Sequence, residues 1–593
     1  MNFSLTYNYD NRNRLEEITY PDSSTASYDY DAAGNLLTAT NNNASLNFAY
    51  DSMNRLSSVT QSVLSAQSAL QYSRDLNGNI TNITIGAGLP SARTIQYSYD
   101  EVNRLTDVDL SAFSVFQPFS FSYDSAGRVT NITYPNGVTA AFSSDAEGRL
   151  IAYTSSNGTN FIDRSISRNP LGFKSNECVN VGLAPEPAET QGADREYNDA
   201  DQLTSQTIQQ GTNTSTVLYS YSDNGCLTNS TGQGGVQYTW DYDNRLTSIS
   251  HNSTNISYIY DAQGSRVARV EDGVTNIFVL NYADPLKRPL CELNADGEIE
   301  RYYIWGNAGI LCHVESNGTV RYYHSDEQGS TLALTDENGD VTDQFAYMPY
   351  GDSVRTGTTQ TPFKWIGGYG VQDEGNGLYF MLNRHYSTQT RQWLCADPIG
   401  LAGGANLYTY ANLNPANSID PKGLDYYSNY ISDGNHQYGF NGNEFVEFDN
   451  SAHAIGTAAI QAGDAIMGYG ALVSGAAGVG IGGVVLTVEA TPFVIAGATT
   501  AGAAGRDAFY RVMAWQPMSI LDSAILHYPQ LPPVHASVGE MVYNLTPALN
   551  TIANDMLPTG PSFSAALFQE WPAGFPSAIW NAGTTDLAKR YEY

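Results

Sequence analysis

Short stretches in which apolar and polar residues alternate recur along the chain, each followed by a polar turn. In Ile95-Gln96-Tyr97-Ser98-Tyr99 the alternation places one kind of side chain on each face, as in a half-buried β-strand. A polar stretch from Asp100 to Asn103 follows, and Arg104-Leu105-Thr106 begins the next apolar run. The pattern therefore predicts a strand, a tight turn and a second strand in each unit.

The units repeat with a regular spacing. Tyr30-Asp31, Tyr50-Asp51 and Tyr99-Asp100 are each followed by Asn or Gly and then by Leu. Aspartates at positions 10, 31, 51, 75, 100, 124 and 145 are separated by 21, 20, 24, 25, 24 and 21 residues. This spacing fits one hairpin per unit. Because one hairpin cannot bury its own apolar face, we expect the units to be stable only as a stack.

The composition favours the same mainly β fold. A chain of 593 residues exceeds one ordinary core, and its 41 tyrosines and 54 glycines suit twisted strands joined by tight turns. A tyrosine ring can cover the inner face of a sheet while its hydroxyl group reaches a polar partner. Many turns can therefore stack with few aliphatic residues.

Charge and cysteine content exclude several classes of function. A net charge of −32 argues against a shell that binds nucleic acid, which requires clustered Lys and Arg. The five cysteines, at 178, 226, 291, 312 and 395, are not spaced like a disulfide framework, and at least one must be a free thiol. No zinc-type spacing occurs, so we expect no metal and no cofactor. Asp336 begins a calcium-like loop, but Val341 replaces the turn glycine, and we expect a hairpin turn there.

Two Asp-Pro-x-Gly-Leu boxes carry the candidate chemistry. The first runs from Asp397 to Leu401 and the second from Asp420 to Leu424, with the two aspartates twenty-three residues apart in sequence. Two carboxylates on rigid turns can share one proton, as aspartyl-type peptide cleavage requires. The alternative is purely structural, because aspartate, proline and glycine together also form turns that have no catalytic role.

The repeats resemble the YD repeats of the Rhs family, over roughly residues 1–424. The more specific similarity lies in Tyr322-Tyr323-His324-Ser325-Asp326-Glu327-Gln328-Gly329-Ser330, in Gly377-Leu378-Tyr379-Phe380 and in the double box. The resemblance implies a β-strand spiral closed into a hollow shell, as in Rhs effectors, C components of ABC toxins and teneurins. It divides the chain into a YD-repeat shell (1–300), a repeat-associated core (301–424) and a variable C-terminal payload (425–593).

In the bacterial toxin branch of the family, the chain cuts itself at the second box. The resemblance implies that Asp397 and Asp420 are the catalytic pair, that the cut lies between Leu424 and Asp425, and that each molecule turns over once. This chain departs from the family pattern at Gln392, where an arginine is expected, so Arg391 would have to support the pair. His324 and His385 also lie in motif segments, and we interpret both as polar residues lining a tyrosine-rich shell.

The payload has a different composition. Residues Ala465–Val488 carry no charge, and Gly470, Ser474, Gly478 and Gly482 form a small-residue stripe. This pattern predicts a glycine-rich helical hairpin at about 454–508 within a small α-rich domain. The hairpin would insert into a target membrane, or would pack inside a soluble domain, since glycine weakens both hydrophobicity and helix propensity. An enzymatic payload within 509–593 is a third possibility, although no catalytic spacing stands out there.

The sequence thus predicts an Rhs-type polymorphic toxin whose shell encapsulates an effector released by self-cleavage. The alternative is a cell-surface or adhesion protein with a purely structural shell. The expected partners are the chain's own payload, an immunity protein, a delivery or secretion component and a target membrane. The chain begins with no apolar signal segment, so we expect secretion or surface display by another route.

Overall fold

The computed structural model describes residues 4–447, with gaps at 90, 171, 181–192, 211–212, 233–234, 308, 433–436 and 441–444. All of these residues belong to one compact unit, Met1–Gly470. The payload from 448 onward, with the predicted glycine-rich hairpin and α-rich domain, lies outside the described residues. None of the helices in the described part is long and apolar enough to cross a membrane.

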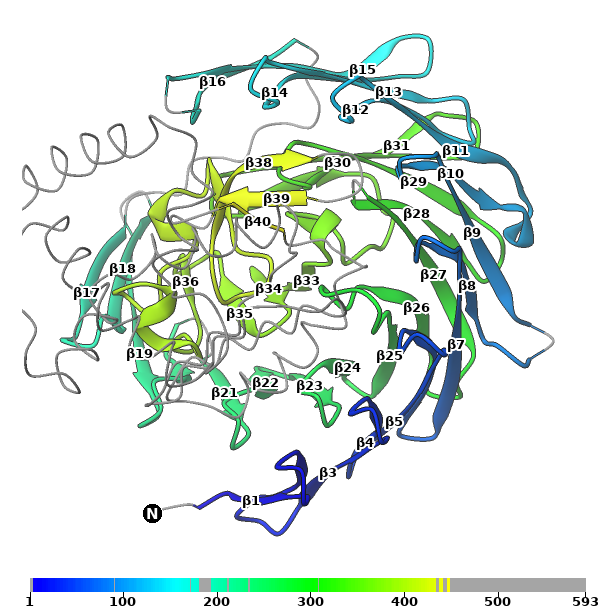
Figure 1. Ribbon diagram of the computed structural model, residues 1–593. Helices are drawn as coiled ribbons and strands as arrows, with labels where there is room; N and C mark the ends of the chain where they lie inside the picture. The colour runs from blue at the N-terminus through cyan, green and yellow to red at the C-terminus, as the bar shows by residue number, and fades with distance from the viewer. Residues whose placement is uncertain are drawn as a thin grey trace, which may run out of the picture. The chain divides into compact units, whose positions relative to one another are not determined.

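The described chain is mainly β, and its first sheet has sixteen strands in sequence order (Figure 1). Each strand pairs antiparallel with the next, as expected for a series of hairpins. The strands are β1 (Thr6–Tyr9), β2 (Leu15–Thr19), β3 (Thr25–Tyr30), β4 (Leu36–Asn41), β5 (Ala44–Tyr50), β6 (Leu56–Val63), β7 (Ala66–Arg74), β8 (Ile80–Ile85), β9 (Arg93–Tyr99), β10 (Leu105–Leu110), β11 (Val115–Tyr123), β12 (Val129–Thr133), β13 (Thr139–Ser144), β14 (Leu150–Ser156), β15 (Asn160–Arg168) and β16 (Lys174–Val179).

A second sixteen-stranded sheet follows with the same sequential order. Its strands are β17 (Ala193–Tyr197), β18 (Leu203–Gln210), β19 (Asn213–Tyr221), β20 (Leu227–Ser230), β21 (Val236–Trp240), β22 (Leu246–His251), β23 (Thr254–Tyr260), β24 (Arg266–Glu271), β25 (Val274–Leu280), β26 (Pro289–Leu293), β27 (Ile299–Gly306), β28 (Gly309–Glu315), β29 (Val320–Ser325), β30 (Thr331–Thr335), β31 (Val341–Tyr347) and β32 (Ser353–Thr356). The boundary expected at residue 300 falls inside β27. The calcium-like segment at Asp336 is a turn between β30 and β31, as predicted.

Two small sheets complete the described fold. One contains β33 (Gln372–Gly375), β34 (Leu378–Met381), β35 (Arg384–Ser387) and β36 (Gln392–Trp393), and the other contains β37 (Ser418–Ile419), β38 (Tyr427–Ser432), β39 (Gln437–Phe440) and β40 (Phe445–Glu447). Short 3-10 helices are the only helices among the described residues: η1 (Ser111–Phe113), η2 (Gly367–Tyr369), η3 (Gly400–Gly403) and η4 (Ala411–Leu413).

The Tyr-Asp turns form because one aspartate satisfies several donors. In the turn at Asp100, carboxylate Oδ1 accepts hydrogen bonds from the backbone N–H groups of Val102 and Arg104, at 3.0 and 2.9 Å. The guanidinium of Arg104 donates to Oδ2 at 2.7 Å, and Asn103 takes the left-handed conformation at φ 65°. The same Asp–Arg pair recurs between residues 10 and 14, 51 and 55, 124 and 128, 145 and 149, and 241 and 245.

In several units the tyrosine connects the unit to the preceding one. The hydroxyl group of Tyr99 donates to the carbonyl oxygen of Ile80 at 2.9 Å, and that of Tyr123 to the carbonyl of Leu105 at 2.6 Å. Similar bonds join Tyr50 to Leu36, Tyr260 to Leu246, and Tyr347 to Thr331. The predicted role of tyrosine, an apolar ring with a paired hydroxyl group, is confirmed in these units.

The second sheet runs alongside the first. In Figure 1 the blue-to-cyan strands curve around the green strands, and one buried core contains side chains from both sheets, including Val59, Ile95, Val267 and Ile304. Hydrogen bonds between the sheets follow the sequence order of both sheets, joining Tyr28 to Ala262, Gln61 to Phe278, Tyr97 to Trp305, Tyr134 to Tyr323 and Asn157 to Gly339. The paired residues are 182 to 234 positions apart, so the chain follows the same curved path twice.

There are two buried polar networks: the first attaches the segment after β32 to the second sheet, and the second joins neighbouring strands within that sheet. In the first, Glu374 of β33 accepts from the guanidinium groups of Arg266 and Arg269 and from the Tyr258 hydroxyl, the last at 2.9 Å. Burial alone would raise the pKa of Glu374, but the two arginines together outweigh it and lower this pKa. Glu374 therefore stays ionised.

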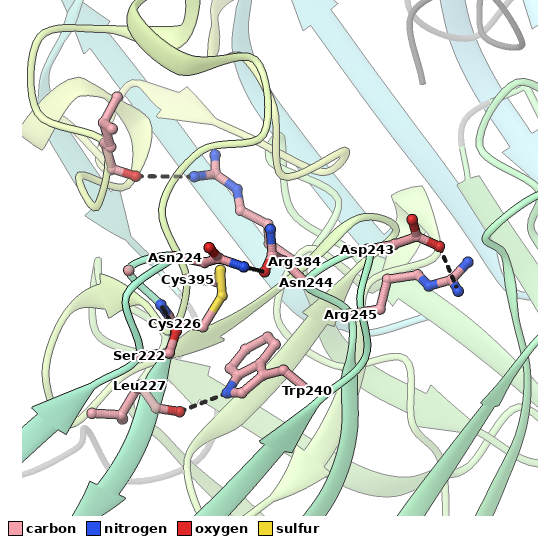
Figure 2. The surroundings of a disulfide bond; sticks show 12 residues. Ser222, Asn224, Cys226, Leu227, Trp240, Asp243, Asn244, Arg245, Arg384 and Cys395 are labelled. Atoms are coloured by element: carbon pink, nitrogen blue, oxygen red, sulfur yellow. Dashed lines mark hydrogen bonds and ion pairs between the residues drawn. A yellow bond between two sulfur atoms is a disulfide. The ribbon is translucent and has the colours of Figure 1, made fainter. Parts of the chain in front are cut away.

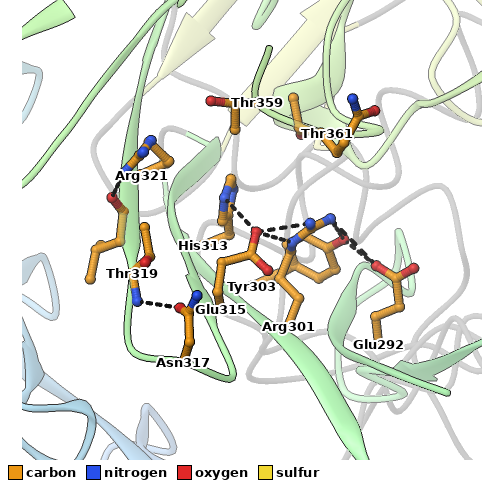
Figure 3. A network of polar contacts seen from close by, with 12 residues as sticks. Glu292, Arg301, Tyr303, His313, Glu315, Asn317, Thr319, Arg321, Thr359 and Thr361 are labelled. Carbon is orange, nitrogen blue, oxygen red and sulfur yellow. Dashed lines mark hydrogen bonds and ion pairs between the residues drawn. The ribbon is translucent and has the colours of Figure 1, made fainter. Parts of the chain in front are cut away.

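In the second network, side chains from β26, β27 and β28 point toward one another (Figure 3). The Tyr303 hydroxyl donates to Glu292 at 2.7 Å, and Arg301 donates to Glu315 at 3.0 Å. His313 is bonded to the Tyr323 hydroxyl at 2.7 Å, and burial lowers its pKa, so the imidazole is neutral at neutral pH. Most polar groups of the network are paired with one another, which fits a structural role.

Candidate active site

The first box is a turn that begins four residues after the end of β36. The carbonyl oxygen of Asp397 accepts the N–H of Gly400 at 3.0 Å, and carboxylate Oδ1 accepts the N–H of Ile399 at 3.0 Å. Gly400 takes the left-handed conformation, at φ 61°, which explains the glycine of the motif. The turn leaves the other carboxylate oxygen, Oδ2, available for contacts outside the box.

The second box follows β37 and has a similar turn. The Asp420 carbonyl accepts the N–H of Gly423 at 3.3 Å, while Asp420 Oδ1 accepts the N–H of Leu424 at 3.1 Å. Gly423 has φ 66°, and a Cβ there would lie 2.8 Å from the Met381 carbonyl oxygen. A larger residue would therefore push the box away from β34 and β35.

One arginine contacts both boxes. Nη2 of Arg384, in β35, lies 2.7 Å from Asp397 Oδ2 and 3.5 Å from Asp420 Oδ2. Its Nε donates to the Gly423 carbonyl, and its guanidinium carbon lies 4.1 Å from the centre of the Trp393 ring. Arg384, Asp397 and Asp420 are all buried, at 5%, 9% and 3% exposure. The structure thus brings the two predicted aspartates to the same cation.

The two carboxylates approach different groups of Leu424, the residue before the expected cut. Asp420 accepts a hydrogen bond from the N–H group of Leu424, as described above. The carbonyl oxygen of Leu424 lies near Asp397: the position that a Cβ on Gly403 would occupy is 2.6 Å from Asp397 Oδ2 and 2.9 Å from Leu424 O. The peptide group that joins Leu424 to Asp425 is therefore within reach of the aspartate pair.

Burial and mutual repulsion keep protons in this site. Burial raises the pKa of Asp397 to about 6, and Arg384 offsets only part of that effect. Burial raises the pKa of Asp420 to about 7, and the nearby Asp397 and Asp425 add to the rise. Burial likewise raises the pKa of Asp425 to about 6. Near neutral pH the pair Asp397 and Asp420 can hold one proton between them.

The other residues expected from the sequence lie elsewhere. The guanidinium of Arg391 stands over the Tyr350 ring at 5.1 Å, and Gln392 pairs with Ser387 in the small sheet. Arg384, which sequence reasoning did not assign to the site, makes the contacts expected of a supporting arginine. A signal was present, because Arg384 begins the motif segment Arg384-His385-Tyr386 just upstream of the first box.

Both motif histidines are buried among aromatic or polar neighbours. His324 is bonded to the Thr335 hydroxyl at 2.9 Å and its ring packs against Tyr134. His385 packs against the rings of Tyr258 and Phe380. Burial lowers the pKa of each to about 3, so both are neutral at physiological pH. These placements agree with the polar, tyrosine-lined environment predicted for them.

A disulfide that sequence reasoning missed lies two residues before Asp397. Cys226 and Cys395 are bonded across 169 residues of sequence (Figure 2). Next to this disulfide, the backbone N–H of Leu227 donates to the Leu394 carbonyl at 2.7 Å. Leu394 also pairs with His385, the neighbour of Arg384. The disulfide thus attaches the first box to the second sheet. The remaining cysteines, 178, 291 and 312, are free thiols.

Comparison with known proteins agrees with this fold. Residues 187–416 match the teneurin YD-shell family, and residues 9–46 and 123–160 match the RHS repeat family. The crystal structure of TcdB2-TccC3 is similar over 71% of this chain and 28% of that one, with 14% identity and a TM-score of 0.51. The fold is that of a YD-repeat protein with large antiparallel sheets. The chain belongs to the Rhs/YD-repeat family.

Several curated relatives are toxins or nucleases by name. The tRNA3(Ser)-specific nuclease WapA of Bacillus spizizenii is 30% identical over 216 residues, which cover 34% of this chain and 9% of that protein. Toxin protein Tse5 of Pseudomonas aeruginosa is 33% identical over 110 residues, covering 18% of this chain and 8% of Tse5. Toxin subunit YenC2 of Yersinia entomophaga is 27% identical over 187 residues, which cover 28% of this chain and 19% of YenC2. The chain therefore spans only a small part of the length of these relatives.

Proposed function

We propose that this chain is an Rhs-type toxin that cuts itself after Leu424 and so frees a C-terminal payload held in a closed β-shell. The observation that supports cleavage is the position of Leu424, whose N–H is held by Asp420 and whose carbonyl oxygen lies beside Asp397. The named toxins among its relatives support the payload. The shared curved path of the two sheets supports the shell.

The proposed reaction is hydrolysis of the peptide bond between Leu424 and Asp425. The ionised member of the aspartate pair takes a proton from a water molecule, whose oxygen adds to the Leu424 carbonyl carbon. The pair shares one proton, and in the reactive form Asp397, the member beside the Leu424 carbonyl oxygen, carries that proton and donates it to the oxygen as charge develops there. When the C–N bond breaks, the nitrogen of Asp425 takes the proton that the base removed from water, and the product carboxyl group returns a proton to Asp397. The products are a new carboxyl group on Leu424 and a new amine on Asp425.

Arg384 has two roles in this mechanism. It offsets the charge of the ionised carboxylate, and it holds the second box in place through the Gly423 carbonyl. Because the peptide and the carboxylates belong to one folded chain, no binding step is required. A single turnover is sufficient to free the payload.

The test is a time course of the purified full-length chain on denaturing gels. Wild type should give fragments 1–424 and 425–593, while Asp397→Asn and Asp420→Asn should remain intact. Asp326→Asn is the matched control, because burial also raises the pKa of Asp326 to about 7 but its carboxylate only caps a turn. An uncut wild type would favour the alternative, a non-enzymatic surface or adhesion protein.

For the payload we propose insertion into a target membrane, based on the uncharged stretch Ala465–Val488 and its small-residue stripe. Bacteria that produce residues 425–593 should lose membrane potential. A variant with Gly478→Asp and Gly482→Asp should be harmless, because two charges interrupt the apolar stretch. Normal membrane potential with the unaltered payload would reject membrane insertion. If the payload is toxic in this way, an immunity protein that protects the producing cell would be a further partner.

We also propose that the protein acts outside the cell that makes it, at the surface or after secretion through a delivery component. The Cys226–Cys395 disulfide supports this proposal, because such bonds persist in oxidising surroundings. Free-thiol counting under denaturing conditions provides a test. Protein from the culture medium should have three free thiols, and a count of five would contradict export into an oxidising environment.

A further inference from the structure

Gly403 follows the first box and lies between Asp397 and the peptide that is to be cut. It ends η3, which begins at Gly400. A Cβ built on Gly403 would stand 2.6 Å from Asp397 Oδ2, 3.0 Å from Asp397 Cγ and 2.9 Å from the Leu424 carbonyl oxygen. These separations are well below ordinary van der Waals contact, so a side chain at this position would have to displace both groups.

The backbone conformation does not explain why this residue is a glycine. The neighbouring Gly400 and Gly404 have φ 61° and 136°, which favour glycine, and a Cβ on either would meet nothing within 4 Å. Gly403 shows the reverse combination, because its φ lies outside the left-handed region and its missing Cβ faces Asp397 and Leu424. The requirement at position 403 is therefore for space.

The groups around this space have little freedom to move. Asp397 Oδ2 is held by Arg384 at 2.7 Å, and Oδ1 accepts the N–H of Ile399. On the other side, Leu424 is fixed through its N–H to Asp420 and through the bond from Arg384 to the adjacent Gly423 carbonyl. A methyl group between them would separate the carboxyl of Asp397 from the carbonyl oxygen.

We propose that Gly403 is a positioning residue for self-cleavage: its missing side chain lets the carboxyl of Asp397 reach the Leu424 carbonyl oxygen. The inference rests on the self-cleavage proposed above. It makes the glycine at the end of η3 a requirement of the reaction, whereas Gly400 and Gly404 are required by the turn. A shift of a few tenths of an ångström to 1 Å in a reacting group is expected to slow a positioned reaction by about 10- to 100-fold.

The experiment compares Gly403→Ala with Gly404→Ala in the full-length chain. Gly403→Ala should cleave about 10- to 100-fold more slowly than wild type. Gly404→Ala should cleave at close to the wild-type rate, although its backbone strain lowers the unfolding temperature. The pH optimum of the residual cleavage by Gly403→Ala should also rise, because the methyl group excludes solvent from Asp397 and so raises the pKa of that carboxyl. A purely structural effect would not shift that profile.

A second measurement does not depend on activity. Gly403→Ala is introduced into two uncut backgrounds, Asp420→Asn and Asp397→Ala, and the unfolding temperatures are compared. The added methyl group should destabilise the first background more than the second, because only the first retains the carboxyl that it meets. Equal effects in the two backgrounds would overturn the inference.

The outcomes separate this inference from the proposal on which it rests. If wild type is not cut, self-cleavage itself is rejected. If wild type is cut and Gly403→Ala is cut at the same rate, only the role of Gly403 is rejected.

Discussion

Two buried acidic sites in this protein differ in the ratio of carboxylates to arginines, and their pKa values move in opposite directions. Glu374 faces two arginines, Arg266 and Arg269, and its pKa is lowered. Asp397 and Asp420 share one arginine, Arg384, and the pKa of each is raised. Burial penalises the charged carboxylate in both places, so the number of neighbouring cations decides the result. The first site is suited to hold the fold together, and the second to hold a proton.

The largest expected effect comes from removing the shared cation. Arg384→Gln should reduce self-cleavage by more than about 100-fold, because both box carboxyls would then be protonated and the Gly423 carbonyl would lose its donor. Removing one member of a buried ion pair should also lower the free energy of unfolding by about 3–5 kcal/mol. Gel time courses measure the first effect, and denaturant unfolding in the Asp420→Asn background measures the second.

Arg355→Gln is the matched control, because Arg355 is exposed and lies at the end of the second sheet, in β32. It should cleave like wild type. Wild-type cleavage by Arg384→Gln would show that charge sharing at this arginine is unimportant.

The next effect is that of pH. The pKa of Asp397 is raised to about 6 and that of Asp420 to about 7, so the pair carries one proton mainly between these values. Below this range both carboxyls are protonated and no base remains, while above it the proton donor is lost. The cleavage rate should therefore peak between about pH 6 and 7 and fall by about tenfold per pH unit on either side. A rate that is constant from pH 4 to pH 9 would contradict the shared proton.

A smaller effect on cleavage, but a large one on stability, is expected at the contrasting site. Glu374→Gln leaves the buried Arg266 without its carboxylate and removes one of the two carboxylates that pair with the half-buried Arg269, so the free energy of unfolding should fall by about 3–5 kcal/mol. Measured at low temperature, where the variant is folded, cleavage should stay within about threefold of wild type, because Glu374 makes no bond to either box. Complete loss of cleavage in folded Glu374→Gln would show that the Glu374 site is also required for the reaction.

The smallest effect should come from Arg391, the arginine that the sequence suggested. Its guanidinium stands over the Tyr350 ring, and Arg384 is the arginine that contacts both aspartates. Arg391→Ala should therefore change the cleavage rate by less than about twofold. A fall in the cleavage rate as large as that expected for Arg384→Gln would show that Arg391 supports the aspartate pair.

The parts of this structure that are local could be predicted from the sequence. The turn at Asp100 depends on donors within four residues, so the Tyr-Asp-x-x-Asn-Arg pattern already contains its cause. The two boxes were recognisable for the same reason, since each closes its own turn. What the pattern could not give was the relation between them, because that depends on chain segments far apart.

Arg384 and the disulfide illustrate this limit. Arg384 reaches both aspartates because β35 pairs with β34 and β36, which sets its position relative to boxes 13 and 36 residues away in sequence. Cys226 and Cys395 lie 169 residues apart, and only the folded path of the second sheet brings them together. Long-range pairing of this kind has no local sequence signal.

The central claim is that the peptide bond between Leu424 and Asp425 is cut by the aspartate pair beside it. Intact-mass analysis of the purified wild-type chain near pH 6.5, with sequencing of the new amino terminus, tests this claim most directly. The account predicts two masses, for residues 1–424 and 425–593, with Asp425 as the first residue of the smaller fragment. A single uncut mass, or a cut at another bond, would contradict it.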